Sequence, residues 1–175
     1  VLWLAPSLGP AQIEHLARKY AKTNKEWEDD WLRGTPADQL KHRVKQATER
    51  FEMLYGDLDE AQIGLLRTEL AGASYNARML RSERLRRQED ILQTLRQVSA
   101  GNLSPEAIRE SLHALLGRLT TPPGPAGKAY AETTLRENCA LFARLHNSTS
   151  PAQRARAVKT LRGYEEDFRA LSATR

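Results

Sequence analysis

The feature that most constrains this chain is a recurring pair of residues, in which a helix-capping residue is followed by proline. It occurs as Gly9-Pro10, Thr35-Pro36, Ser104-Pro105 and Ser150-Pro151. Proline is favoured at the first position of a helix, and a Ser or Thr before it can accept hydrogen bonds from unpaired N–H groups. Asp59-Glu60 provides a fifth start, with negative charge at the helix N-terminus. The pattern predicts a chain divided into many helices.

Helix ends are marked as clearly as helix starts. Gly34, Gly56 and Gly101 stand where a residue in the left-handed region ends a helix, and Asn147 can take the same role. The run Pro122-Pro123-Gly124-Pro125 predicts a linker that is not helical, because prolines lack the backbone donor. Gln153 follows Ser150 by three residues, which is the spacing of a capping box.

Between these marks, apolar residues recur every three or four positions, as on one side of an α-helix. The expected helices cover residues 10–33, 36–55, 60–71, 76–100, 105–119, 129–146 and 151–172. Asn24 interrupts the apolar stripe of the first. We predict an all-α fold of about seven amphipathic helices in antiparallel hairpins. They form a helical bundle, for which an elongated or solenoid-like arrangement stays open.

Composition favours one folded unit with an ordinary surface. The 175 residues suit a single domain, 1–175, with a sub-boundary open at the proline-rich linker, 121–127. The net charge is +5, from 27 Lys and Arg against 22 Asp and Glu, and the two signs are interleaved. This favours mixed-charge helix faces over a nucleic-acid-binding surface. Val1 to Leu4 is a short apolar fragment that resembles the cut end of a longer chain.

Four helix starts echo one another. Leu8 to Ile13 resembles Leu58 to Ile63, and residues 103–108 and 149–154 are looser echoes. The equivalent positions 12, 62, 107 and 153 are separated by 50, 45 and 46 residues. A period of about 45 is typical of stacked helix pairs. Repeated use of the same capping residues is the favoured explanation of the echoes, because the intervening segments do not match.

Motifs for catalysis and metal binding are missing from the sequence. It has no Gly-rich phosphate loop, no paired cysteines at metal-ligand spacing and no nucleophile elbow. The histidines lie in separate expected helices, namely His15, His42, His113 and His146. We therefore expect a protein that is not an enzyme, with no catalytic residue, no metal site and no cofactor. Cys139 shares a helical stripe with Leu135 and Phe142, so we expect this single cysteine to be buried.

A basic helix face is the strongest candidate for an electrostatic surface. Its residues are Arg78, Arg81, Arg84 and Arg87, spaced by three along the expected helix 76–100. Such a face could bind an anion, an acidic partner or nucleic acid. No aromatic residue is interleaved for base stacking, which disfavours single-stranded nucleic acid. The alternative is a solvated helix face.

The C-terminal half carries the most distinctive motifs. They are Arg136-Glu137-Asn138-Cys139-Ala140-Leu141, then Leu145-His146-Asn147-Ser148-Thr149-Ser150-Pro151-Ala152-Gln153-Arg154, then Leu161-Arg162-Gly163-Tyr164-Glu165-Glu166-Asp167. Together with Glu26-Trp27 and the Gly34-Thr35-Pro36 break before Arg43, they resemble a family of uncharacterised bacterial envelope lipoproteins, grouped as a domain of unknown function. The motif residues we single out are Asn138, Cys139, His146, Asn147, Ser150, Pro151 and Arg154.

The resemblance implies a location rather than an activity. Such proteins begin with a lipoprotein signal peptide and a further helical segment, and we expect both upstream of Val1. The lipid would be carried by an upstream cysteine and not by Cys139. The implied location is the periplasm of a Gram-negative cell, tethered to a membrane. More loosely, Leu8 to Gln12 and Leu58 to Gln62 are similar to the Leu-Thr-x-x-Gln signature of Spy-type periplasmic helical chaperones, with Gly9 and Asp59 replacing the threonine.

These expectations combine into one functional hypothesis with two alternatives. The chain is expected to be a non-enzymatic periplasmic lipoprotein domain that binds protein partners or unfolded clients through helix surfaces. One alternative is a structural envelope scaffold with one fixed partner. The other is an anion or nucleic-acid binder that uses the Arg78 to Arg87 face. Membrane contact is expected only through the upstream lipid anchor.

Overall fold

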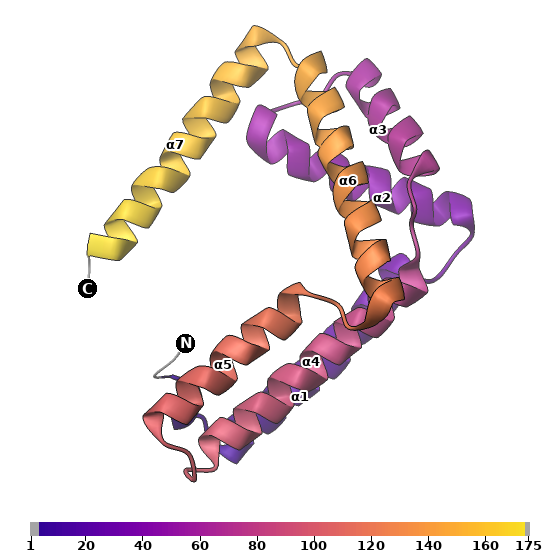
Figure 1. Ribbon diagram of the computed structural model, residues 1–175. Coiled ribbons are helices and arrows are strands. Elements are labelled where there is room, and N and C mark those ends of the chain that lie inside the picture. Colours follow the sequence, from indigo (N-terminus) through magenta and orange to yellow (C-terminus); the bar gives the residue numbers. More distant parts are fainter. Residues whose placement is uncertain (1–3, 174–175) are drawn as a thin grey trace. The chain divides into compact units, whose positions relative to one another are not determined.

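The computed structural model describes residues 4–173, so Val1 to Trp3 of the expected cut end lie outside the described residues. Its helices are η1 (Ala5–Ser7), α1 (Pro10–Trp31), α2 (Pro36–Tyr55), α3 (Glu60–Gly72), α4 (Ala77–Ser99), α5 (Pro105–Thr120), α6 (Gly124–Ser148) and α7 (Pro151–Ala173), as Figure 1 shows. No strand occurs between residues 4 and 173. The all-α prediction is confirmed, and none of these helices is long and apolar enough to cross a membrane.

Local hydrogen bonds fix the predicted helix starts and ends. Side chains of Thr35, Asp59 and Ser104 each accept a backbone N–H from the third residue of the helix that follows. The predicted capping box is confirmed, because Gln153 Oε1 accepts the Ser150 N–H at 2.9 Å and Ser150 Oγ accepts the Gln153 N–H at 3.2 Å. The predicted glycine ends at Gly56 and Gly101 are also confirmed, with φ of 78° and 76°. Gly34 has a φ of 85°, but α1 ends earlier than predicted, at Trp31, with Leu32 as its C-cap.

Three of the four echoing helix starts also have the residue pattern of a hydrophobic staple. The residue before each cap is Leu8, Leu58, Leu103 or Thr149, and the fourth residue of each helix is Ile13, Ile63, Ile108 or Arg154. In the first three starts, both apolar residues of the pair belong to the same core. In the last, the pair is polar, and Arg154 Nε donates to Thr149 Oγ1 at 3.1 Å.

The helices form two compact units. The first comprises Val1–Arg33 and Tyr75–Thr133, and the second comprises Gly34–Ser74 and Thr134–Arg175. The chain therefore passes between them three times, the last time inside α6. None of the three crossings falls in the linker 121–127 that the sequence marks.

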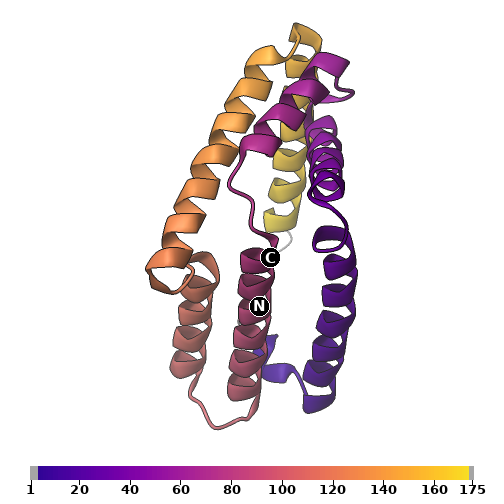
Figure 2. The same ribbon diagram turned by 90° about the vertical axis from the view of Figure 1, so that its right-hand side faces the viewer.

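In the first unit, α4 is the central helix. It packs against η1, α1 and α5, and Figure 2 shows it between α1 and α5. Its hydrogen bonds to α1 join Arg81 to Glu28 and Gln88 to Asn24, so the two helices are antiparallel. The core of this unit contains the buried side chains of Ile13 from α1, of Leu92, Leu95 and Val98 from α4, and of Leu112 from α5.

In the second unit, α2 packs against α3 and α7, and α6 contributes Leu141 and Leu145 to a core with Leu58 and Leu66. The predicted burial of the Leu135, Cys139 and Phe142 side of α6 is wrong, since all three are exposed. Polar contacts explain the choice of face. Glu137 accepts the Ser74 N–H, and Arg144 pairs with Glu69 of α3, so the α6 face that contains Leu141 is turned toward α3.

Two predictions at the ends of α6 are also wrong. The helix begins at Gly124, so Pro125 lies in its first turn, where a missing N–H costs no hydrogen bond. The helix ends at Ser148, and Asn147 is helical, with no positive φ at any described residue other than glycine. The non-helical linker therefore shortens to the residues before Gly124.

The revised face of α6 predicts opposite effects for two leucines of the same helix. We expect Leu145→Ala to lower the free energy of unfolding by about 3 kcal/mol, because Leu145 is 0% exposed and its removal leaves a cavity. The matched control Leu135→Ala should change it by less than about 0.5 kcal/mol, since Leu135 is 63% exposed. Urea unfolding followed by circular dichroism measures both, and equal losses would contradict the observed face.

Candidate functional site

The predicted arginine face is largely occupied by partners within the first unit. Arg81 Nε donates to Glu28 at 2.6 Å, and Arg84 Nε donates to Asn24 at 2.8 Å, both on α1. Arg87 Nε donates to Glu83 of its own helix at 2.7 Å. Arg78 is exposed beside an open cavity of about 510 Å³ that Arg81 and Leu85 also line. Two of the four predicted residues, Arg81 and Arg84, thus join α4 to α1, and a third, Arg87, is paired within α4.

A second group of charges joins α4 to α5. Arg118 of α5 donates two hydrogen bonds to the Asp90 carboxylate, at 2.8 and 2.9 Å. Arg86 bonds Glu83 at 2.7 Å and lies 3.5 Å from Asp90. The hydrogen bonds from Arg118 hold the pKa of Asp90 below its ordinary value, and those from Arg86 and Arg87 do the same for the pKa of Glu83. In both carboxylates, these bonds outweigh the opposing effect of burial.

The motif residues at the end of α6 and the start of α7 lie in or beside a hydrogen-bonded junction of the second unit, which brings the starts of α3 and α7 together. Gln62 Nε2 donates to Gln153 Oε1 at 3.0 Å, and Gln153 Nε2 donates back to Gln62 Oε1 at 3.0 Å. Each amide also donates across the junction, Gln62 to the Ser148 carbonyl and Gln153 to the Asp57 carbonyl. Because each Oε1 also caps its own helix, both amides are fully hydrogen bonded.

Most of the motif residues singled out in the sequence make contacts at or beside this junction. His146 Nδ1 lies 2.8 Å from the Tyr55 hydroxyl, which is buried enough that its pKa is raised. Arg154 donates to Thr149 and, at 3.5 Å, to the Asn147 carbonyl. Ser150 caps α7 and Pro151 is its first residue. Within the second unit, these residues position helices; Asn138 and Cys139 lie away from them on α6.

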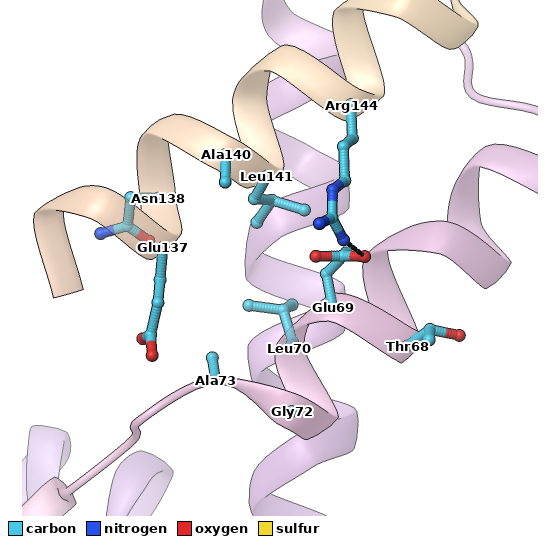
Figure 3. A pocket seen from close by; sticks show the side chains of 10 residues that line it. All are labelled: Thr68, Glu69, Leu70, Gly72, Ala73, Glu137, Asn138, Ala140, Leu141 and Arg144. Atoms are coloured by element: carbon cyan, nitrogen blue, oxygen red, sulfur yellow. Dashed lines mark hydrogen bonds and ion pairs between the residues drawn. The ribbon is translucent and has the colours of Figure 1, made fainter. Parts of the chain in front are cut away.

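Asn138 lines an open pocket between α3 and α6, drawn in Figure 3. Its volume is about 370 Å³, and its charged residues are Glu69, Glu137 and Arg144. Glu137 accepts two bonds from the Ser74 N–H, at 2.9 and 3.1 Å, and Glu69 pairs with Arg144. The charges are therefore compensated within the unit, and we assign no ligand to the pocket. No group of three His, Cys, Asp or Glu side chains in residues 4–173 is placed to hold a metal ion.

The exposed apolar side of α7 is the most distinctive surface of the second unit. Five of the eleven large apolar side chains exposed between residues 4 and 173 lie on this helix: Val158, Leu161, Tyr164, Phe168 and Leu171. At 100° per residue they span an arc of about 140°, the width of a core-facing stripe. Ala157 lies within the same arc and is buried, and α7 packs on α2. We call the five exposed residues the α7 face.

Sequence reasoning found the spacing of the α7 face but not its exposure, because a core-facing stripe has the same spacing. It also missed the pairing of Gln62 with Gln153. A glutamine at the third helical position in three of the echoing starts, Gln12, Gln62 and Gln153, was the available signal, but the sequence pointed to Gln12 and Gln62 as the similar pair.

No family model, no curated protein and no solved structure matches this chain. The lipoprotein and chaperone resemblances therefore stay predictions that rest on the motif residues.

The glutamine pair gives a prediction with an internal control. We expect Gln62→Ala to lower the free energy of unfolding by about 2–3 kcal/mol, because Gln62 is 3% exposed and its loss leaves several buried polar groups unpaired. Gln12→Ala removes a similar cap, the 2.7 Å bond to the Gly9 N–H, from an exposed start, so it should cost about 1 kcal/mol or less. Chemical unfolding measures both variants. Equal losses of unfolding free energy would show that Gln62 stabilises the fold only by capping α3, and not by its pairing with Gln153.

The Asp90 contacts predict a dependence of stability on pH. Because the pKa of Asp90 is lower in the folded state, its carboxylate stabilises the fold above about pH 4, and this contribution fades as the pH falls through the lowered value. We expect Asp90→Asn to cost about 1–2 kcal/mol at pH 7 and progressively less toward pH 2. The control is Asp30→Asn, at an exposed position of α1. If the unfolding free energies of the wild type and Asp90→Asn still differed by the same amount at pH 2, this role of Asp90 would be contradicted.

Proposed function

We propose that this chain is a non-enzymatic, protein-binding domain of a periplasmic lipoprotein, and that the α7 face is its docking surface for a partner or client. The observation that carries the proposal is this face, whose side chains are 49–71% exposed. Large apolar surfaces rimmed by charge are typical of protein-binding sites. Periplasmic location and a membrane tether are supported by the family resemblance.

The chaperone-like form of this proposal has a specific physical requirement. A client-binding surface must accept many apolar sequences, so it needs accessible apolar side chains with charged neighbours that keep the protein soluble. On α7, Arg162, Glu165 and Arg169 border the apolar residues and are exposed. A scaffold with one fixed partner would use the same face with greater selectivity. The arginine face of α4 supports neither use, since most of it is occupied within the first unit.

Suppression of client aggregation tests the proposal. We expect the protein, in molar excess, to slow light scattering by reduced α-lactalbumin, and Phe168→Gln with Leu171→Gln to remove most of this effect. Both side chains are 71% exposed, so the variant should fold normally, which circular dichroism checks.

The matched control is Leu135→Gln with Met53→Gln, which removes equally exposed apolar side chains from α6 and α2. It should leave suppression unchanged. If the unmodified protein fails to slow aggregation, the client-binding form is wrong. Recovery of one stoichiometric partner, lost in the α7 variant, would then favour the scaffold.

A further inference from the structure

The order of charges along α7 is complementary to itself. The first half of the helix carries four basic side chains and the second half three acidic and one basic, namely Arg154, Arg156, Lys159 and Arg162, then Glu165, Glu166, Asp167 and Arg169. All eight side chains are exposed, and Arg169 pairs with Glu165 within the helix. Two such helices side by side in parallel would place like charges together, whereas antiparallel packing places each basic half beside the acidic half of the other.

We propose that the α7 face is covered by the α7 face of a second copy of this chain, in an antiparallel two-fold pair. The inference rests on the proposed function only in taking this face as a protein-docking surface. It names the partner as a second copy of the chain. In an isologous interface the same surface occurs on both copies, so that surface must be complementary to itself.

One register satisfies the apolar and the charged residues together. If Leu161 of one copy lies level with Phe168 of the other, then Val158 is level with Leu171. At 100° per residue, Arg162 then lies on the same side of the seam as Glu165 and Glu166 of the other copy, within about two residues of their level. Lys159 lies on the far side of the helix and contributes only to the positive charge of that half. Two stripes of about 140° can form such a seam, as in an antiparallel coiled coil.

The area of the seam sets the expected strength of the pair. The side chains are 49–71% exposed, so two copies would bury roughly 1,000 Å² of apolar surface between them. This is the lower limit for a specific interface, so we expect a dimer with a dissociation constant in the micromolar range. Dilution would release the face, so the monomer would be the form that binds clients.

Sedimentation velocity over a range of concentrations, up to about half-millimolar, tests the pair with the full 175-residue chain. The wild type should form dimers, and Leu161→Gln with Phe168→Gln should raise the dissociation constant at least about tenfold. The control Leu135→Gln should leave it unchanged.

Charge variants test the antiparallel order. Lys159→Glu with Arg162→Glu makes this part of α7 acidic, and Glu166→Lys with Asp167→Lys makes it largely basic. Each variant alone should dimerise more weakly than the wild type, while an equimolar mixture should form the heterodimer. Failure of the mixture to associate would overturn the charge argument.

The remaining outcomes separate this inference from the proposed function. A wild type that stays monomeric, or dimerises regardless of the α7 variants, overturns the inference. If that monomer still slows client aggregation through α7, the proposed function stands. Dimerisation through α7 without any client or partner binding would support the inference alone. Binding of phosphatidylglycerol vesicles by α7 without self-association would assign the face to a membrane and overturn the inference.

Discussion

The arrangement of the second unit depends on the reciprocal hydrogen bonds between Gln62 and Gln153. Each glutamine must cap its own helix, and the remaining amide hydrogens find acceptors only if the starts of α3 and α7 lie together. The pair therefore fixes α7 by its first turns, through Gln153, Arg154 and the buried Ala157. Along the rest of α7, the large apolar side chains of the α7 face are exposed.

In the first unit, charge has a similar organising role through α4. Arginines that look in sequence like a binding surface instead reach Glu28 and Asn24 on α1, while Asp90 receives Arg118 from α5. The same contacts explain why Asn24 interrupts the apolar stripe of α1, since it bonds both Arg84 and Gln88. Desolvated charges without partners would be costly, so the pairing specifies which helices become neighbours.

Particular residues show where prediction from sequence succeeds and where it stops. Thr35-Pro36 and Gly56 bound α2 correctly because capping and left-handed φ are local properties of a few residues. The buried face of α6 could not be found in the same way, because Leu135, Cys139 and Phe142 form as good a stripe as Leu141 and Leu145. Its orientation was decided by Glu137 and Arg144, whose partners Ser74 and Glu69 lie more than sixty residues away in the chain. The α7 face was visible as a pattern, but its exposure was not.

The sequence by itself determined the helical class, the five capped starts and the glycine ends at Gly56 and Gly101, because each depends on hydrogen bonds and dihedral angles within a single turn. Tertiary structure alone decided which apolar stripes are buried, which arginines form ion pairs or hydrogen bonds, and which two capping glutamines bond each other. These outcomes depend on contacts between segments far apart in sequence, where several arrangements satisfy the same local rules. In the sequence, the repeated helix starts left a regular stack open. In the structure two of them lie in each unit, three with an apolar pair around the cap and one with a polar pair.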